Sequence, residues 1–366
     1  MFYSLSLMIA EENYELESLQ KNVPLAPLTT LKIGGAARFF VAARSESEVV
    51  GAIEFARENS LEIFILGGGS NVLISDAGFD GLVLQVALKG VSTFPEADGT
   101  LYVAAQAGED WDELVAFCVE KNLAGTECLS GIPGFVGGTP VQNVGAYGQE
   151  VSETIVSVRA FDRQKNRITE LTNAECGFAY RTSIFNTTEK NRYIVLRVTY
   201  ALKHKGEPRI VYRDLRKFFG DRKPDLTQTR RAVLKIRAEK SMVIDETDPN
   251  SRSAGSFFKN PIVDNSEFSE IVERARALGI EEVPHFPVDA GSLYKIPAAW
   301  LIENSGFRKG FRRGNAGLST RHTLALINTG GATALDILNL KDEIQKKVLG
   351  NFGVSLVPEP VFVGFD

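Results

Sequence analysis

The chain has 366 residues, which is enough for two or three domains. It carries 41 Lys and Arg against 46 Asp and Glu, and this net charge of −5 gives no reason to expect nucleic acid or a membrane as a partner. No apolar run approaches the ~18 residues of a membrane span, and residues 1–10 lack the basic start of a secretory signal. The three Cys and three His are scattered without a CxxC or HExxH pattern, so we expect a reducing cytoplasm and no metal site.

The first part of the chain has the pattern of a small α/β unit. Residues 37–43 and 61–66 are apolar and partly aromatic, and they predict two strands. Between them, Ser45 and Glu48 form a capping box that would start a helix. This order predicts a right-handed βαβ crossover. A second helix is predicted over residues 110–121.

Further along, the pattern changes to strands and then back to helices. We expect a strand-rich part over 155–202 with a strand at 193–202, a basic helix at 227–240, a helix at 333–349 and a last strand at 354–363. Gly350 is expected to end the long helix. Pro358 and Pro360 lack an N–H group, so the last strand should be an edge strand or a bulged one.

A first glycine-rich stretch, residues 66–71, reads Leu-Gly-Gly-Gly-Ser-Asn. It is neither a dinucleotide fingerprint, because Val72 takes the place of the last glycine, nor a phosphate loop ending in Lys. A tight hairpin without a ligand is the interpretation that this segment alone favours. The alternative is a nest of backbone N–H groups around a diphosphate, with Ser70 and Asn71 as further donors.

A second glycine-rich stretch covers residues 132–148 and reads IPGFVGGTPVQNVGAYG. Thr139, Gln142 and Asn143 are interspersed among its glycines. Backbone without side chains, together with scattered hydroxyl and amide groups, suits a phosphate-bearing cofactor laid along the main chain. A glycine-rich structural loop explains the same pattern equally well.

Three more motifs follow in order: GFAYRTSIF at 177–185, AGSFFKNP at 254–261 and the pair Pro358-Glu359. With the two glycine-rich stretches, they make the chain resemble the UDP-N-acetylenolpyruvoylglucosamine reductases, bacterial flavoenzymes of peptidoglycan precursor synthesis. The resemblance runs from about Pro27 to Gly364.

This resemblance implies an α+β fold with two lobes of the vanillyl-alcohol-oxidase (PCMH) type that hold FAD non-covalently. A C-terminal α/β domain would bind the substrate. We expect the first lobe at 1–90, completed by a C-terminal strand at 352–366, the second lobe at 91–226 and the substrate domain at 227–351. The resemblance further implies NADPH as co-substrate, and we expect a cytoplasmic monomer.

The glycine-rich stretches are the parts of the family that contact FAD. By their match to these stretches, the expected FAD contacts are Leu66, Gly67, Gly68, Gly69, Ser70, Asn71, Ile132, Pro133, Gly134, Gly138, Thr139, Pro140, Asn143, Gly145 and Ala146.

Three positions match the family's catalytic residues. In the implied reaction, hydride passes from NADPH to FAD and then to C3 of the enolpyruvyl ether, and a proton reaches C2. The match implies that Ser256 donates this proton and that Arg181 and Glu359 flank the developing enolate. Without the resemblance, the three would be read as a loop serine, a surface arginine and a solvated edge-strand glutamate.

Less specific matches to the family imply that the substrate contacts are Tyr147, Tyr212, Lys240, Asn260 and His322. Tyr212 matches the substrate-covering tyrosine of one subtype, although a half-buried strand aromatic is the ordinary alternative. Lys240 could equally be a solvated helix end, and Asn260 a turn residue before proline. The segment 241–253 looks longer and more acidic than the family's connection, which leaves the register of Lys240 open.

Two other functions stay open from the sequence. The first is a flavin oxidase or dehydrogenase of the same fold, which would not need Ser256, Glu359 and Arg181 together. The second is a non-catalytic nucleotide-sugar binding protein that has lost the flavin, and such a protein would be colourless.

Overall fold

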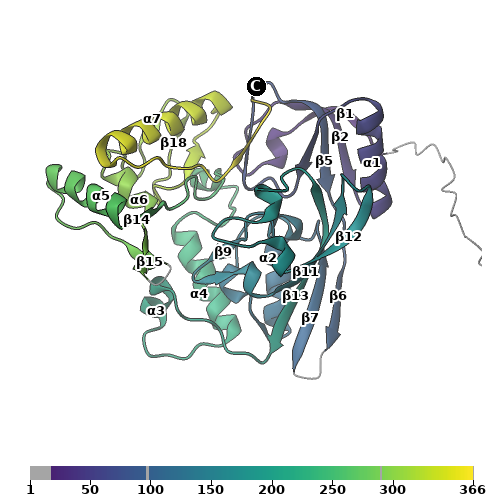
Figure 1. The fold of residues 1–366 in the computed structure, drawn as a ribbon, viewed down its shortest axis with the longest axis horizontal. Helices are drawn as coiled ribbons and strands as arrows, with labels where there is room; N and C mark the ends of the chain where they lie inside the picture. The colour runs from purple at the N-terminus through teal and green to yellow at the C-terminus, as the bar shows by residue number, and fades with distance from the viewer. Residues whose placement is uncertain (1–17, 96–98, 289–290, 366) are drawn as a thin grey trace, which may run out of the picture.

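The computed structural model describes residues 18–95, 99–288 and 291–365. Helices and strands form three regions that follow one another along the chain (Figure 1). In the view of Figure 1, a sheet with helix α1 lies at the upper right and a larger sheet with α2 lies below it. The third region, with α5, α6 and α7, lies at the left. No helix in the described ranges is both long and apolar enough to cross a membrane.

The first sheet has the strand order β1-β2-β5-β3. Its region contains β1 (Gln20–Pro24), β2 (Ala36–Ala43), α1 (Glu46–Glu58), β3 (Ile63–Leu66), β4 (Val72–Ile74) and β5 (Phe79–Val86). Both β2 and β3 run parallel to β5, which lies between them, so the predicted strand–helix–strand order is confirmed. The Ser45 side chain accepts the N–H of Glu48, as a capping box requires. The Glu48 carboxylate, however, accepts the N–H of Arg44 and not that of Ser45.

The first glycine-rich stretch does not form the hairpin that its sequence favours. β4 pairs in parallel with the C-terminal strand β20 (Val361–Val363), whereas β3 belongs to the first sheet. The stretch therefore connects two different sheets, and the hairpin interpretation is wrong. The last strand is also shorter than predicted, because it forms only after Pro358 and Pro360, which cannot donate hydrogen bonds.

The second region is an antiparallel sheet with the order β12-β11-β13-β7-β6, and β8 also pairs with β13. Its elements are β6 (Val91–Pro95), β7 (Thr100–Gln106), α2 (Trp111–Glu120), β8 (Leu123–Ala124), β9 (Gly145–Ala146), β10 (Gln149–Glu150), β11 (Ile155–Asp162), β12 (Arg167–Thr172) and β13 (Tyr193–His204). The helix predicted over 110–121 is confirmed, and Asp110 caps it by accepting the N–H of Glu113. Trp111 and Tyr200 are buried in a core that the region shares with the first sheet.

The rest of the chain is mainly helical, with two small three-stranded sheets. It contains α3 (Arg213–Phe219), α4 (Leu226–Glu239), β14 (Ile262–Asp264), α5 (Asn265–Ala277), β15 (Phe286–Val288), β16 (Leu293–Lys295), α6 (Ala298–Glu303), β17 (Arg312–Arg313), β18 (Ala316–Leu318), β19 (Leu326–Asn328) and α7 (Ala334–Phe352). The expectation that Gly350 ends α7 is wrong. The helix continues to the buried Phe352 and ends at Gly353, whose φ of 74° is the left-handed conformation of a C-terminal cap. Leu335 is 60% exposed, whereas Ile337 and Leu340 belong to the buried face of the helix.

Contacts tie the third region to the first. The Thr30 hydroxyl donates to the Ser253 carbonyl at 2.6 Å, and the Asn328 side chain donates to the Leu31 carbonyl at 3.1 Å. Asp76 accepts the first two N–H groups of α7. The residue limits of the three predicted domains are not tested by these contacts and stay a prediction.

Candidate active site

The two glycine-rich stretches meet in space. A Cβ atom added to Gly68 would lie 2.6 Å from the Gly134 Cα, and one added to Gly134 would lie 2.8 Å from the Ser70 hydroxyl. A side chain at either position would push the two chain segments apart. The glycines therefore allow residues 67–71 and the start of the second stretch to form one continuous surface.

The first stretch has the features of an anion-binding nest. Gly69 has a φ of 66°, and a Cβ atom there would lie 1.9 Å from the Leu28 carbonyl oxygen. In the described part of the chain, the N–H groups of Gly68, Gly69 and Ser70 donate no hydrogen bond. Consecutive free N–H groups beside a left-handed residue bind phosphate oxygens. No protein atom lies within 4 Å of a Cβ added to Gly67 or Gly138, so the backbone at both positions is open to a ligand. We call the surface formed by the two glycine-rich stretches the glycine cradle.

The second stretch offers fewer free groups for cofactor binding than expected, because several of its polar groups form hydrogen bonds within the protein. Gly137 and Gly138 donate their N–H groups to the carbonyls of Ala107 and Phe135. The buried Thr139 hydroxyl contacts the Val136 carbonyl and the Tyr200 hydroxyl.

Asn143, which is also buried, has its side chain turned inward. Its amide group bonds to Glu150 and to the Ala179 carbonyl. Among the predicted FAD contacts, the side chains of Thr139 and Asn143 thus hold the loop in shape. Ile132, Pro133, Gly134 and Ala146 are partly exposed, whereas Leu66 and Pro140 are buried.

Arg181 and Glu359, which are 178 positions apart in the chain, lie together. Arg181 Nε is 3.5 Å from Glu359 Oε2, with 22% and 10% of the two side chains exposed. Arg181 Nη2 donates to the Gly145 carbonyl at 2.7 Å, which connects the pair to the second glycine-rich stretch. Among the described residues, the buried Nε has no hydrogen-bond partner, although the Glu359 carboxylate faces it at ion-pair distance. A buried, unsatisfied guanidinium N–H is costly, and an anion placed against it would remove the cost.

The backbone of Arg181 is also unusual. Its φ of 53° is left-handed, a conformation that costs a residue with a side chain on the order of 1–3 kcal/mol. Its carbonyl accepts the side-chain amide of Asn186 at 3.2 Å and the ammonium of Lys259 at 3.4 Å. Such strain is retained where the surroundings hold the residue in place, and it is common in active sites.

The chain carrying Ser256 lies against Glu359. The Phe257 carbonyl accepts the N–H of Glu359 at 2.9 Å, and Asn71 of the first glycine-rich stretch donates to the Glu359 carbonyl at 3.2 Å. Ser256 is partly exposed, and its hydroxyl has no hydrogen-bond partner among the described residues. Burial raises the pKa of Glu359, while Arg181 and Lys259 act in the opposite direction. The three predicted catalytic residues are thus close to one another and to the glycine cradle.

A second group of side chains gathers around Tyr147. Its ring meets that of Tyr212 edge to face at 5.4 Å, and the Lys240 ammonium lies 5.8 Å from it. Lys240 also forms a 2.8 Å ion pair with Asp214. Tyr212 is 44% exposed and precedes α3 as its N-cap, so the alternative of a strand aromatic is wrong.

The structure places His322 with this group as well. Burial, reinforced by Lys240 and Lys309, lowers the pKa of His322 to about 4. Asn260, in contrast, lies with the catalytic group, because it hydrogen-bonds to Tyr180 next to Arg181. The Asn260 side-chain oxygen also accepts the N–H of Ala298 at the start of α6. The five predicted substrate residues therefore divide into two neighbouring groups.

Three residues of the site were missed by the sequence interpretation. Tyr180 and Lys259 lie inside the quoted motifs. The Tyr180 hydroxyl and the Lys259 charge, next to predicted catalytic residues, could have marked them as site residues. Arg237 lies on the buried face of α4 and donates to the carbonyls of Gly131 and Met242. A basic residue at a helix position that faces the core could have marked it.

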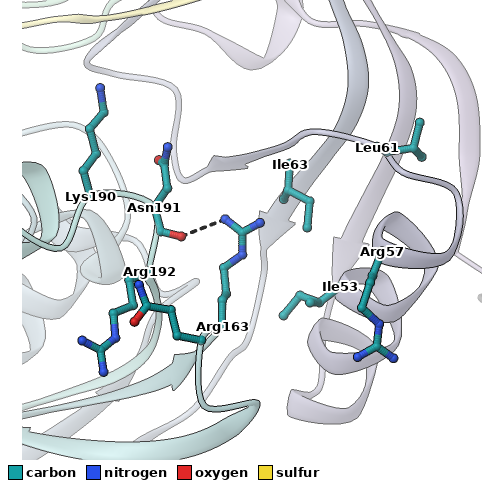
Figure 2. A pocket seen from close by; sticks show the side chains of 9 residues that line it. Ile53, Arg57, Leu61, Ile63, Arg163, Lys190, Asn191 and Arg192 are labelled. Carbon is teal, nitrogen blue, oxygen red and sulfur yellow. Dashed lines mark hydrogen bonds between the residues drawn. The ribbon is translucent and has the colours of Figure 1, made fainter.

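A cavity of about 440 Å³ lies elsewhere, between α1 and the turns at 162–164 and 190–192 (Figure 2). Its lining includes none of the predicted site residues. Figure 2 shows the Arg163 side chain directed at the Asn191 carbonyl, which accepts its hydrogen bond, while Lys190 and Arg57 point away from Arg163. The cavity is therefore not part of the candidate site.

Comparison with known proteins agrees with this geometry. Residues 37–172 match the sequence model of an FAD binding domain, and residues 248–363 match that of the C-terminal domain of UDP-N-acetylenolpyruvoylglucosamine reductase. The reductase of Thermobifida fusca is 46% identical over 352 residues, which are 95% of this chain and 98% of that protein. That of Streptomyces coelicolor is 46% identical over 359 residues, 95% of this chain and 92% of that protein.

The fold agrees as well. The crystal structure of the Thermus caldophilus reductase covers 93% of this chain and 97% of its own, with a TM-score of 0.63 at 24% identity. The predicted α+β fold, with an FAD-binding part and a C-terminal domain, is confirmed. The chain therefore belongs to the UDP-N-acetylenolpyruvoylglucosamine reductases, a family of FAD-dependent oxidoreductases.

Proposed function

We propose that the protein uses NADPH to reduce UDP-N-acetylglucosamine enolpyruvate to UDP-N-acetylmuramate, as a monomer in the cytoplasm. The observation that carries the proposal is the buried Arg181–Glu359 pair, whose guanidinium Nε is unsatisfied and which lies beside both the glycine cradle and the Ser256 segment. An enolpyruvyl substrate brings a carboxylate, and its reduction needs a cation and a proton donor at adjacent positions.

FAD, when bound, would supply the transfer of hydride from NADPH to C3 of the enolpyruvyl group. The free N–H groups of Gly68, Gly69 and Ser70 would bind its diphosphate, and Gly67 and Gly138 would leave room for it. No Cys or His lies in either glycine-rich stretch to form a covalent bond, so the cofactor should be released when the protein is denatured.

Arg181 would bind the enolpyruvyl carboxylate. The guanidinium group presents a planar fork of N–H donors that matches a carboxylate. Negative charge grows on C2 and the carboxylate as C3 receives hydride, so a fixed guanidinium stabilises the transition state more than the ground state.

Ser256 would deliver the proton to C2, and Glu359 would lie at the other side of the developing charge. A serine hydroxyl is a weak acid, but the carbanion at C2 is a stronger base, so the transfer is favourable. Burial raises the pKa of the Glu359 carboxyl above its ordinary value, so this group takes up a proton more readily than an exposed glutamate, and its protonated form can donate a hydrogen bond to the enolate.

The nucleotide part of the substrate would lie along the second group. Lys240 offers a positive charge for the diphosphate, with His322 beside it, and the rings of Tyr147 and Tyr212 offer apolar surface. The position of the Lys240 ammonium, 5.8 Å from the Tyr147 ring, supports this proposed role.

The test is turnover with product analysis. Purified holoprotein should oxidise one NADPH per molecule of UDP-N-acetylglucosamine enolpyruvate and form a product that is two hydrogen atoms heavier. NADPH oxidation that does not depend on this substrate, or a colourless protein that binds the UDP-sugar without changing it, would contradict the proposal.

A further inference from the structure

Lys259 contacts a strained residue of the candidate site. Its ammonium donates to the Arg181 carbonyl at 3.4 Å, and Arg181 has a left-handed φ of 53°. The Asn186 side-chain amide donates to the same carbonyl at 3.2 Å. Lys259 lies three residues after Ser256, so its contact connects the segment of the proposed proton donor to the peptide of Arg181.

The Lys259 backbone is itself fixed against the strand segment that carries Glu359. Its N–H donates to the Val357 carbonyl at 2.9 Å, and Phe258 pairs with Pro358 as an isolated bridge. The base of the Lys259 side chain is therefore fixed, and its ammonium contacts the Arg181 carbonyl and acts on the charge of Glu359.

The charged and titratable groups that act on the Glu359 carboxylate come from two segments. Arg181 and Tyr180 belong to one, and Lys259 belongs to the other. Asn71, which donates to the Glu359 carbonyl, is neutral, as is its partner Gln142. Lys259 thus supplies a second positive charge at a carboxyl group that is otherwise faced by Arg181 alone among the described cations.

We propose that Lys259 is a positioning residue of the reductase: it holds the strained peptide of Arg181 in place and adds positive charge on the side of the site where Arg181 faces Glu359. This inference rests on the proposed function. Both effects require a positive, hydrogen-bond-donating group at the end of a flexible chain, which Lys and Arg share. A Gln at this position keeps a hydrogen-bond donor without the charge, and a Met removes the charge and the donor together.

The experiment compares FAD-loaded Lys259→Met, Lys259→Gln and Lys259→Arg proteins with the parent. In Lys259→Met, displacement of Arg181 should raise KM for the enolpyruvyl substrate and lower kcat/KM by between about ten- and a hundred-fold. Lys259→Arg should recover most of this loss. Reduction of the flavin by NADPH should stay within about two-fold of the parent in all three variants, since no enolpyruvyl carboxylate takes part in that step.

The pH profile separates the charge from the hydrogen bond. The limb of the kcat/KM–pH profile that is lost in Glu359→Gln reports the ionisation of the Glu359 carboxyl. That limb should move to higher pH in Lys259→Met and Lys259→Gln, because both lose the cation that favours the ionised carboxylate, and it should stay in place in Lys259→Arg.

A second readout does not depend on turnover. Amide hydrogen exchange in peptides covering residues 179–183 should be faster in Lys259→Met than in the parent. The matched control is Lys32→Met, because the Lys32 ammonium also donates to a backbone carbonyl, that of Pro27, at an exposed place outside the site. Lys32→Met should behave like the parent.

The possible failures are distinguishable. An inactive parent protein would overturn the proposed function, and hydrogen exchange would still decide whether Lys259 holds the Arg181 peptide. An active parent with unchanged kcat/KM, pH profile and exchange in Lys259→Met would show that Lys259 is not a positioning residue.

Discussion

The two halves of the candidate site are built in opposite ways. The cofactor half consists of backbone. Its glycines let two chain segments approach so closely that no side chain would fit between them, and among the described residues the N–H groups of Gly68 to Ser70 donate no hydrogen bond. The reacting half consists of side chains, above all Arg181 and Glu359, which come from distant parts of the chain and share a buried space. The first half depends on the absence of side chains and the second on their chemistry, so substitutions should affect the two halves separately.

The largest expected effect concerns Ser256. Reduction by NADPH precedes any carbanion, so Ser256→Ala should retain FAD and lose its flavin absorbance with NADPH at close to the parental rate. Reaction with the enolpyruvyl substrate should be slower by a factor of about 10² or more, because the carbanion at C2 then lacks its proton donor. Stopped-flow absorbance measures each half-reaction.

Ser256→Cys sharpens this test. The thiol is a stronger acid but a bulkier group, so we expect part of the substrate reaction to return. If Ser256→Ala loses both half-reactions to the same degree, the serine shapes the pocket, and the division between the two halves fails.

The next effect concerns the fork of Arg181. Arg181→Lys keeps a positive charge but loses the paired N–H groups, and it should lower kcat/KM by a factor that corresponds to about 3 kcal/mol in transition-state stabilisation. FAD affinity, measured by flavin release, should stay near the parental value. An Arg181→Lys protein with near-normal kcat would show that the arginine is structural.

A pair of glycine substitutions tests the cofactor half. A Cβ atom at Gly67 meets no protein atom within 4 Å, whereas one at Gly68 lies 2.6 Å from the Gly134 backbone. Gly67→Ala should therefore leave the melting temperature of the FAD-free protein almost unchanged and weaken FAD binding by about ten-fold, roughly 1.4 kcal/mol. Gly68→Ala should lower both the melting temperature of the FAD-free protein and the affinity for FAD. Equal FAD affinity in Gly67→Ala and the parent would show that the open space at Gly67 is not part of the cofactor site.

The smallest effect should be a pH dependence of stability that arises from His322. Its pKa of about 4 in the folded protein lies below its ordinary value of 6.5, so the unfolded chain binds more protons between these values. Its contribution to stability should be fully present above about pH 6.5 and should decline as the pH falls toward 4. The melting temperature of His322→Gln should therefore fall less over this range than that of the parent. Parallel curves would show that His322 is not buried as a neutral group.

The sequence allowed local elements to be predicted better than their long-range partners. Helix caps such as Ser45 and Asp110 act over three residues, so α1 and α2 could be placed from local pattern alone. The pairing of β4 could not be predicted in this way, because its partner β20 lies almost 290 residues further along the chain. Long-range pairing of this kind leaves no local signal, and the hairpin was favoured for that reason.

The end of α7 shows a related limit. Both Gly350 and Gly353 could end a helix, and the buried contact of Phe352 decides for the second. In the reacting half, the resemblance supplied Arg181, Ser256 and Glu359, but it said nothing of the strained Arg181 backbone or of Lys259. These features depend on how three distant segments pack, which no single motif encodes.

The most direct test of the whole account is the reaction of the reduced protein without oxygen. Holoprotein bleached with one equivalent of NADPH under anaerobic conditions is mixed with UDP-N-acetylglucosamine enolpyruvate. The account predicts that the yellow absorbance returns within the time of one turnover and that one equivalent of UDP-N-acetylmuramate forms. A protein that stays bleached with this substrate, and recovers its colour only when oxygen is admitted, would contradict it.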